Sequence, residues 1–292
     1  LGGRHERSVG RVIEGPRNDQ VHSLSEIQMT LGISVTNPEG IVMAIESRQT
    51  YRGRIGARIG SDAATKIFEL CDGVLAITSG YAFLRPQGSA TLRSISSLVE
   101  DFKASLGAGI GTQGVADQLH QHFLRLYSEH IAQVPGDAVP AGQAALLFLV
   151  GGYDTASRVG TVFECSVPGV VAQRINTNNP STSWIGQWDV VARIIRGWDP
   201  RLLNLASCQQ AGPSLQQELV GLEYFINWHT MTLQDAVDFA RSMIEITISI
   251  QRFTDGLLTN PGDAPGVGGP IDIALVRPDG SVSWVQRKQL HS

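Results

Sequence analysis

Four residues in the N-terminal part of the chain could together carry out hydrolysis with a threonine nucleophile: Thr30, Glu46, Lys66 and Gly80. A threonine hydroxyl is a weak nucleophile unless a base lies beside it. A threonine at a mature N-terminus has such a base in its own α-amine, whose ordinary pKa of roughly 7.7–8.0 leaves part of it neutral near pH 7. Thr30 is therefore the candidate nucleophile.

The other three residues match the supporting roles of such a site. The charge of a lysine such as Lys66 lowers the pKa of a nearby hydroxyl, and a carboxylate such as Glu46 holds that lysine in place. A backbone N–H at a sharp strand end, as at Gly80, can stabilise the oxyanion that forms during acyl transfer. Lys66 is the more informative because the 23 basic residues include just two other lysines, Lys103 and Lys288.

Each candidate lies at the end of a predicted strand. Alternating apolar residues and turn signals predict two hairpins, with strands over 30–35, 41–45, 66–70 and 74–77. Thr30 begins the first strand, Glu46 follows the second and Lys66 begins the third. Gly80 follows the fourth strand, so all four residues stand where a sheet ends.

Helical and strand patterns share the rest of the chain. The predicted helices cover 92–106, 115–127, 190–196 and 232–252. The predicted strands cover 144–151, 161–165, 271–276 and 281–285. Residues 49–62 are interpreted as a connection rich in glycine and arginine. This order predicts an α+β fold with helices outside packed antiparallel sheets.

The first 29 residues differ from the remainder. Four arginines there balance four acidic residues, and the apolar residues follow no period of two or 3.6. Residues 1–29 are therefore predicted to be a disordered lead segment or a propeptide, and residues 30–292 a single folded domain.

Composition excludes several classes of protein. The net charge of −4 and a pI near 6.0 argue against nucleic-acid binding and against a polybasic membrane surface. No apolar stretch approaches the roughly 20 residues of a membrane span, and the first 28 residues hold no apolar block of a signal peptide. Three scattered cysteines exclude a disulfide framework and favour a reduced, cytoplasmic location. No motif calls for a cofactor or a metal.

Several ordered blocks of sequence resemble a proteasome β subunit. They are Thr30–Val35, Gly40–Thr50, Lys66–Leu70, Ala76–Gly80, Leu149–Asp154 and Gly268–Val276. The resemblance runs from about Thr30 to Val285. Ser183–Gly186 looks closer to the bacterial proteasome-like peptidases, especially the ancestral β-subunit type.

The resemblance implies an N-terminal nucleophile hydrolase with a four-layer αββα sandwich. Thr30 would be the nucleophile, Lys66 would tune it, Glu46 would orient Lys66, and the Gly80 N–H would line the oxyanion hole. Glu46 lies 16 residues after Thr30, as in the family, whereas the 36 residues from Thr30 to Lys66 are about four more than usual. The implied activity is a threonine-type endopeptidase working in a self-assembled homo-oligomer, a ring or a helical assembly. Peptides or unfolded proteins would be the substrates, and an ATP-dependent unfoldase is a candidate partner.

The family resemblance also implies a substrate pocket. Its matching positions are Gln49, Ala64, Thr78 and Ala82, all uncharged and three of them small. Such a pocket cannot pair a charged side chain, so cleavage after leucine-like or tyrosine-like residues is expected. Three arginines could reach its mouth and favour acidic groups further along the substrate, although a solvated loop is the commoner role: Arg52, Arg54 and Arg58.

The chain also departs from the family. Gln187-Trp188-Asp189 stand where a Ser-Gly-Ser element usually supports the nucleophile's amine. Phe253 falls nearest to the position of a supporting aspartate, and Asp255 is the closest acid. Met29 replaces the usual glycine before the nucleophile.

Two other functions remain open on sequence alone. One is a catalytically silent, structural proteasome-like subunit in which Thr30 is never exposed. The other is an N-terminal nucleophile amidohydrolase acting on a small amide. Simpler roles are also available for single residues: Glu46 and Arg48 could form a structural ion pair, and Gly80 could be a turn glycine.

Overall fold

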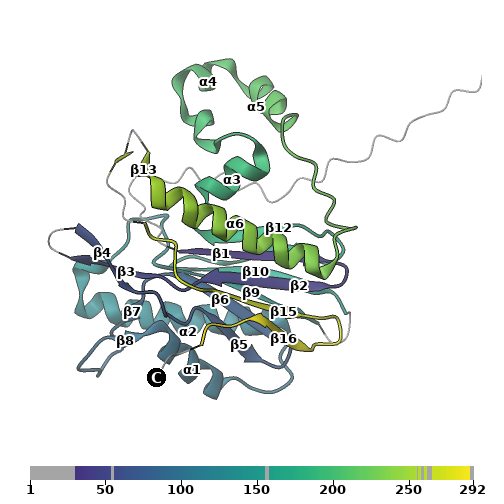
Figure 1. The fold of residues 1–292 in the computed structure, drawn as a ribbon. Helices are drawn as coiled ribbons and strands as arrows, with labels where there is room; N and C mark the ends of the chain where they lie inside the picture. Colours follow the sequence, from purple (N-terminus) through teal and green to yellow (C-terminus); the bar gives the residue numbers. More distant parts are fainter. Residues whose placement is uncertain are drawn as a thin grey trace, which may run out of the picture.

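The computed structural model describes residues 30–53, 56–154, 158–254, 256–257, 260–261 and 265–289. Within them the chain is a mixture of helices and antiparallel sheets, which confirms the predicted class (Figure 1). The predicted lead segment, with Met29, lies outside the described residues, as do Arg54 and Asp255.

The first large sheet contains the strands that flank Thr30 and Glu46. Its strand order is β12–β1–β2–β15–β16, and neighbouring strands are antiparallel. The strands are β1 (Leu31–Asn37), β2 (Gly40–Glu46), β12 (Thr182–Gly186), β15 (Ile271–Val276) and β16 (Val282–Gln286). Every residue of β1 and β2 is buried, as their apolar sequences require.

The second large sheet begins just after Lys66. Its order is β11–β10–β9–β6–β5, again antiparallel. The strands are β5 (Ile67–Cys71), β6 (Val74–Gly80), β9 (Leu146–Tyr153), β10 (Gly160–Val167) and β11 (Val171–Asn176). Both predicted hairpins are confirmed, but β11 was not predicted. It is an edge strand with one fully buried residue, so its sequence carries a weak apolar pattern.

Apolar clusters lie between the two sheets and between each sheet and its helices. Ile41, Met43 and Leu149 are among the residues packed between the sheets. Helices α1 (Ile95–Ser105) and α2 (Thr112–Gln133) pack on the second sheet, and α6 (Leu233–Phe253) and α3 (Asp189–Arg196) pack on the first. Figure 1 shows the two helix groups on opposite sides of the sheets.

Local chemistry sets two helix starts. The helix predicted from residue 92 begins at Ile95, because the Ser94 hydroxyl accepts a hydrogen bond from the Ser97 N–H and caps it. Thr232 and Asp235 form the predicted capping box of α6.

Several short elements were not predicted. Two hairpins, β3 (Gln49–Gly53) with β4 (Gly56–Ser61) and β7 (Phe83–Leu84) with β8 (Arg93–Ser94), and the pair β13 (Gly256–Leu257) with β14 (Asn260–Pro261) lack the alternation of a half-buried strand. The remaining unpredicted elements are β12, η1 (Pro135–Asp137), η2 (Pro200–Asn204), α4 (Ala206–Ala211) and α5 (Pro213–Val220).

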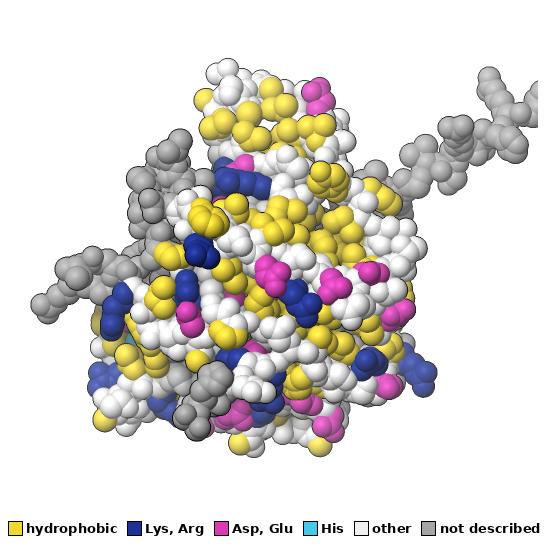
Figure 2. All heavy atoms as spheres, viewed as in Figure 1, with side chains coloured by type: hydrophobic (Ala, Val, Ile, Leu, Met, Phe, Trp, Pro, Cys, Tyr) yellow, Lys and Arg dark blue, Asp and Glu magenta, His cyan; other side chains and the backbone are white. Residues whose placement is uncertain are grey.

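The α4–α5 segment projects from the body of the molecule (Figure 1). Hydrophobic side chains gather on this projection in Figure 2, and those with large exposed fractions are Leu205, Val220, Leu222, Tyr224 and Phe225. Neither helix buries a residue, which explains why no apolar periodicity marks them. Across the described ranges, every helix is too short or too polar to cross a membrane.

Candidate active site

The structure brings together Thr30, Glu46 and Lys66. The Lys66 ammonium donates hydrogen bonds to Thr30 Oγ1 at 2.9 Å and to Glu46 Oε1 at 2.5 Å. All three residues are buried, with exposed fractions of 5% for Thr30, 0% for Glu46 and 8% for Lys66. Thr30 and Glu46 lie at one end of the first sheet, and Lys66 reaches them from the start of the second.

The ammonium of Lys66 has an acceptor for each of its three protons. Besides Thr30 and Glu46, it donates to the main-chain carbonyl of Arg48. The Thr78 N–H donates to the Lys66 carbonyl at 3.0 Å, which fixes the main chain of Lys66 against β6. Lys66 is therefore held by contacts at both ends, and its charge points at the hydroxyl of Thr30.

The second carboxylate oxygen of Glu46 is also occupied. It accepts hydrogen bonds from the Arg48 N–H at 2.5 Å and from the Gly268 N–H at 3.1 Å. Burial raises the pKa of Glu46, and the charge of Lys66 and these donors oppose that effect. Burial lowers the pKa of Lys66, and Glu46 opposes it. Each charge thus makes the burial of the other tolerable.

Arg48 pairs with an acidic residue that the sequence did not reveal. Its Nε and Nη2 bind the two carboxylate oxygens of Asp62 at 2.7 and 3.0 Å, and its Nη1 donates to the Pro265 carbonyl at 3.2 Å. The bond from Arg48 lowers the pKa of Asp62. The guanidinium therefore pairs with Asp62, and Arg48 contacts Glu46 through its main chain.

The main chain of Thr30 is fixed by the end of β12. The Gln187 N–H donates to the Thr30 carbonyl at 2.6 Å. Gly186 adopts φ of +85°, and a Cβ at this position would lie 1.8 Å from the Thr30 oxygen. A glycine is therefore required at position 186, against the main chain of Thr30.

Gln187 and Asp189 form a polar network with Arg201 beside Thr30. Gln187 Nε2 donates to Asp189 at 3.0 Å, and Asp189 lies 3.7 Å from the Arg201 guanidinium. Arg201 also stacks over the ring of Trp188 at 5.2 Å. Phe253, at the end of α6, is 78% exposed and offers no polar group.

Gly80 ends β6, two residues after the threonine that binds the Lys66 main chain. Its φ is +103°, and a Cβ would lie 2.2 Å from the Ala145 carbonyl oxygen. Close main-chain packing is thus sufficient to explain this glycine. Its role at the oxyanion stays a prediction.

The four residues predicted to line a substrate pocket are uncharged, and two contact the site. The Ala64 N–H donates to the Ser47 carbonyl at 3.0 Å, next to Glu46, and Thr78 binds Lys66 as described. The Thr78 hydroxyl donates to the Leu147 carbonyl at 3.2 Å. Gln49 pairs with Ser61 in the β3–β4 hairpin. The Ala82 carbonyl accepts from the Ile95 N–H.

Of the three arginines of the β3–β4 hairpin, the structure describes the side chain of Arg58 alone. The Arg58 guanidinium lies over the ring of Tyr51, 5.6 Å from its centroid. The side chain of Arg52 and all of Arg54 lie outside the described residues. A contact of these arginines with substrate therefore stays a prediction.

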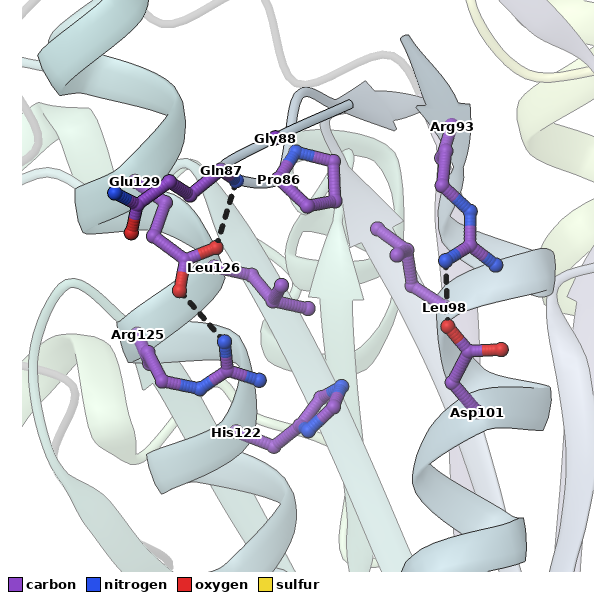
Figure 3. A pocket seen from close by; sticks show the side chains of 10 residues that line it. All are labelled: Pro86, Gln87, Gly88, Arg93, Leu98, Asp101, His122, Arg125, Leu126 and Glu129. Atoms are coloured by element: carbon purple, nitrogen blue, oxygen red, sulfur yellow. Dashed lines mark hydrogen bonds and ion pairs between the residues drawn. The ribbon is translucent and has the colours of Figure 1, made fainter. Parts of the chain in front are cut away.

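A separate cavity of about 420 Å³ lies between α1, α2 and the loop before β8, and holds none of the predicted site residues (Figure 3). Its charges are paired with one another: Arg93 binds Asp101 at 2.6 Å, and Arg125 binds Glu129 at 2.6 Å. Nowhere in the described ranges do three or more histidine, cysteine or acidic residues group as metal ligands. The three cysteines are free.

No family model and no curated protein matches this chain. The chemistry of the Thr30 site and the ordered sequence blocks are therefore the basis for assigning a function.

Proposed function

We propose that this chain is a threonine-type endopeptidase of the N-terminal nucleophile class, with Thr30 as its nucleophile. One observation carries the proposal: a single buried ammonium, that of Lys66, binds both the Thr30 hydroxyl and the buried Glu46 carboxylate. A lysine in this position stabilises the alkoxide form of the hydroxyl and so lowers its pKa.

The reaction begins with the α-amine of a mature Thr30. The amine accepts the proton of Oγ1 while Oγ1 attacks the substrate carbonyl, and the Gly80 N–H binds the resulting oxyanion. The amine then gives its proton to the leaving nitrogen as the C–N bond breaks, leaving an ester on Thr30. Water then attacks this ester with the amine again as base. The bond between the acyl carbon and Oγ1 breaks as the amine returns the proton to Oγ1, and the acid product leaves.

The contacts of Lys66 explain why the amine is needed. A protonated lysine has no lone pair, and this one already donates to three acceptors, so it cannot accept the threonine proton. While residue 29 remains attached, the Thr30 nitrogen is an amide and is not a base. Removal of the preceding residues, or of Met29 alone where it starts the chain, therefore switches the site on.

The arrangement of the sheets supports the finer fold proposal. Two packed sheets with helices on their outer faces are compatible with the four-layer αββα sandwich of proteasome-like hydrolases. On this proposal the chain works in the cytoplasm as a ring or helical homo-oligomer. Peptides or unfolded proteins are its substrates, and an unfoldase is a candidate partner.

Intact mass, N-terminal sequencing and fluorogenic peptide hydrolysis together test the proposal. The active protein should begin at Thr30, Thr30→Ala should lose hydrolysis, and Thr30→Ser should retain part of it. Activity in protein that keeps the preceding residues would overturn the mechanism. A processed protein that forms large assemblies but cleaves no peptide would favour the silent subunit. A small, monomeric protein that hydrolyses simple amides would favour the amidohydrolase.

A further inference from the structure

A second buried lysine–carboxylate pair lies on the same sheet as Glu46. The Lys288 main-chain N–H donates to Asp272 Oδ1 at 2.7 Å, and the Lys288 ammonium binds Oδ2. The side chains are 7% exposed for Lys288 and 3% for Asp272. Two of the three lysines in the chain are therefore buried against carboxylates.

The register of the sheet places the main chain of Asp272 near that of Glu46. In the β2–β15 ladder, Ile271 lies opposite Glu46, and Asp272 lies opposite Ile45. Directly opposed residues of antiparallel strands have Cα atoms about 4.5–5.5 Å apart. Asp272 thus follows Ile271, the residue of β15 that lies opposite Glu46. Strand β16 runs back along β15, which returns Lys288 to the beginning of β15.

Five charged groups besides Lys66 lie at this end of the sheet. Glu46 comes from β2, Arg48 and its partner Asp62 come from the two ends of the β3–β4 hairpin, Asp272 comes from β15, and Lys288 comes from the segment after β16. Burial is the largest cause that lowers the pKa of Lys66; Glu46 and Asp62 oppose it, and the positive charge of Lys288 adds to it. Charges interact over longer distances in a buried site than in water.

We propose that Asp272 and Lys288 are positioning residues for Lys66: the pair holds one buried charge of each sign beside the Lys66–Glu46 pair and adjusts how Lys66 acts on Thr30. The consequence for catalysis rests on the proposed peptidase function. The coupling between the two lysines does not, because it is a property of the folded chain alone.

The two members of the pair have opposite charges, so removing each should have an opposite effect. Lys288→Gln removes a positive charge and leaves the Asp272 carboxylate. The pKa of Lys66 then rises. Asp272→Asn leaves the Lys288 charge without its partner, and the pKa of Lys66 falls. A pair with a merely structural role would give the same effect in both variants.

Lysine labelled with ¹³C at Cε gives a direct test, since the chain has three lysines to assign. In an NMR titration, the midpoint of the Lys66 signal should shift to higher pH in Lys288→Gln and to lower pH in Asp272→Asn. Lys288→Arg should leave the titration midpoint of Lys66 near its wild-type value. Lys103→Gln is the matched control, because Lys103 lies on the surface of α1 and pairs with Glu100.

The alkaline limb of kcat/KM should move in the same directions as the Lys66 titration. The pH at which this limb falls does not depend on the fraction of folded protein, so a partial folding defect does not hide a shift. If Lys288→Gln does not fold, Lys288→Arg remains as the variant of this residue to be measured. An unchanged Lys66 titration in Lys288→Gln, or shifts of one sign in both variants, would overturn the inference. If the NMR shifts occur but the wild type has no Thr30-dependent activity, the proposed function fails and the coupling stands.

Discussion

The main-chain N–H of Gly268 donates a hydrogen bond of 3.1 Å to the carboxylate of Glu46, 222 residues earlier in the chain. The guanidinium of Arg48 packs on the same glycine, because a Cβ at residue 268 would lie 2.4 Å from Arg48 Cζ. The loop before β15 therefore helps to fix the carboxylate that holds Lys66.

Gly268→Ala should disturb this arrangement. The added methyl group forces the Arg48 guanidinium away from Asp62, and the loss of a partly exposed ion pair typically costs about 0–1 kcal/mol. We expect a lower melting temperature and a lower kcat. Gly136→Ala is the control, since a Cβ there has nothing within 4 Å. Equal melting temperatures and turnover for the two variants would contradict the assigned contact.

Lys66→Met should abolish peptide hydrolysis and destabilise the protein. The substitution leaves Glu46 as an unpaired buried charge, and breaking a buried pair in this way costs about 3–5 kcal/mol. The double variant Glu46→Gln, Lys66→Met removes both charges and should recover much of that stability. It should stay inactive, because no cation faces Thr30.

Chemical denaturation and a fluorogenic assay measure the two effects separately. Near-normal turnover in Lys66→Met would show that this lysine does not act on the nucleophile. Recovery of activity in the double variant would show that the single variant is inactive because it is unfolded.

The sequence was sufficient to predict that Thr30, Glu46 and Lys66 lie close together. Each of them stands at one end of a strongly apolar strand, and the ends of neighbouring strands lie near one another. Asp62 and Asp272 could not be found in this way. Their partners lie 14 and 16 residues away, across turns whose geometry no periodicity specifies. Lys288 did carry a signal, since lysine is scarce in this chain.

The fold shows the same division. Apart from β11 and β12, the strands of the two large sheets and the amphipathic helices were predicted from their apolar periods. The β3–β4 hairpin was not, since its sequence lacks apolar alternation, and the α4–α5 projection was not, since its two helices bury no residue.

Asp199 should make the stability of the α3 region dependent on pH. Burial raises the pKa of Asp199, but bonds from Arg201 and Arg193 outweigh it and lower the pKa to about 2. Because the folded-state pKa lies below the ordinary value of 3.8, its stabilising contribution is present above pH 4. It is lost as the pH falls from about 4 to about 2.

Asp199→Asn should make the melting temperature depend less on pH between about pH 2 and pH 4. Thermal melting between pH 2 and pH 6 measures this dependence. An identical pH dependence in Asp199→Asn and the wild type would refute the assignment.

The pocket residues predict cleavage after apolar side chains. Ala64 and Thr78 contact the main chain beside Glu46 and Lys66, and the Thr78 hydroxyl is already bonded to Leu147. A charged side chain would therefore find no partner there, whereas leucine or tyrosine gains from burial. Discrimination among apolar residues should be modest, at about 1–3 kcal/mol for each methylene-sized difference.

A panel of fluorogenic peptides that differ in the residue before the scissile bond measures this preference. Ala64→Asp places a carboxylate beside the pocket and should shift the preference toward arginine. Ala90→Asp, in the loop before β8, adds the same charge elsewhere and should not. If the wild type prefers arginine or glutamate, or if Ala64→Asp leaves the preference unchanged, these residues do not form the pocket.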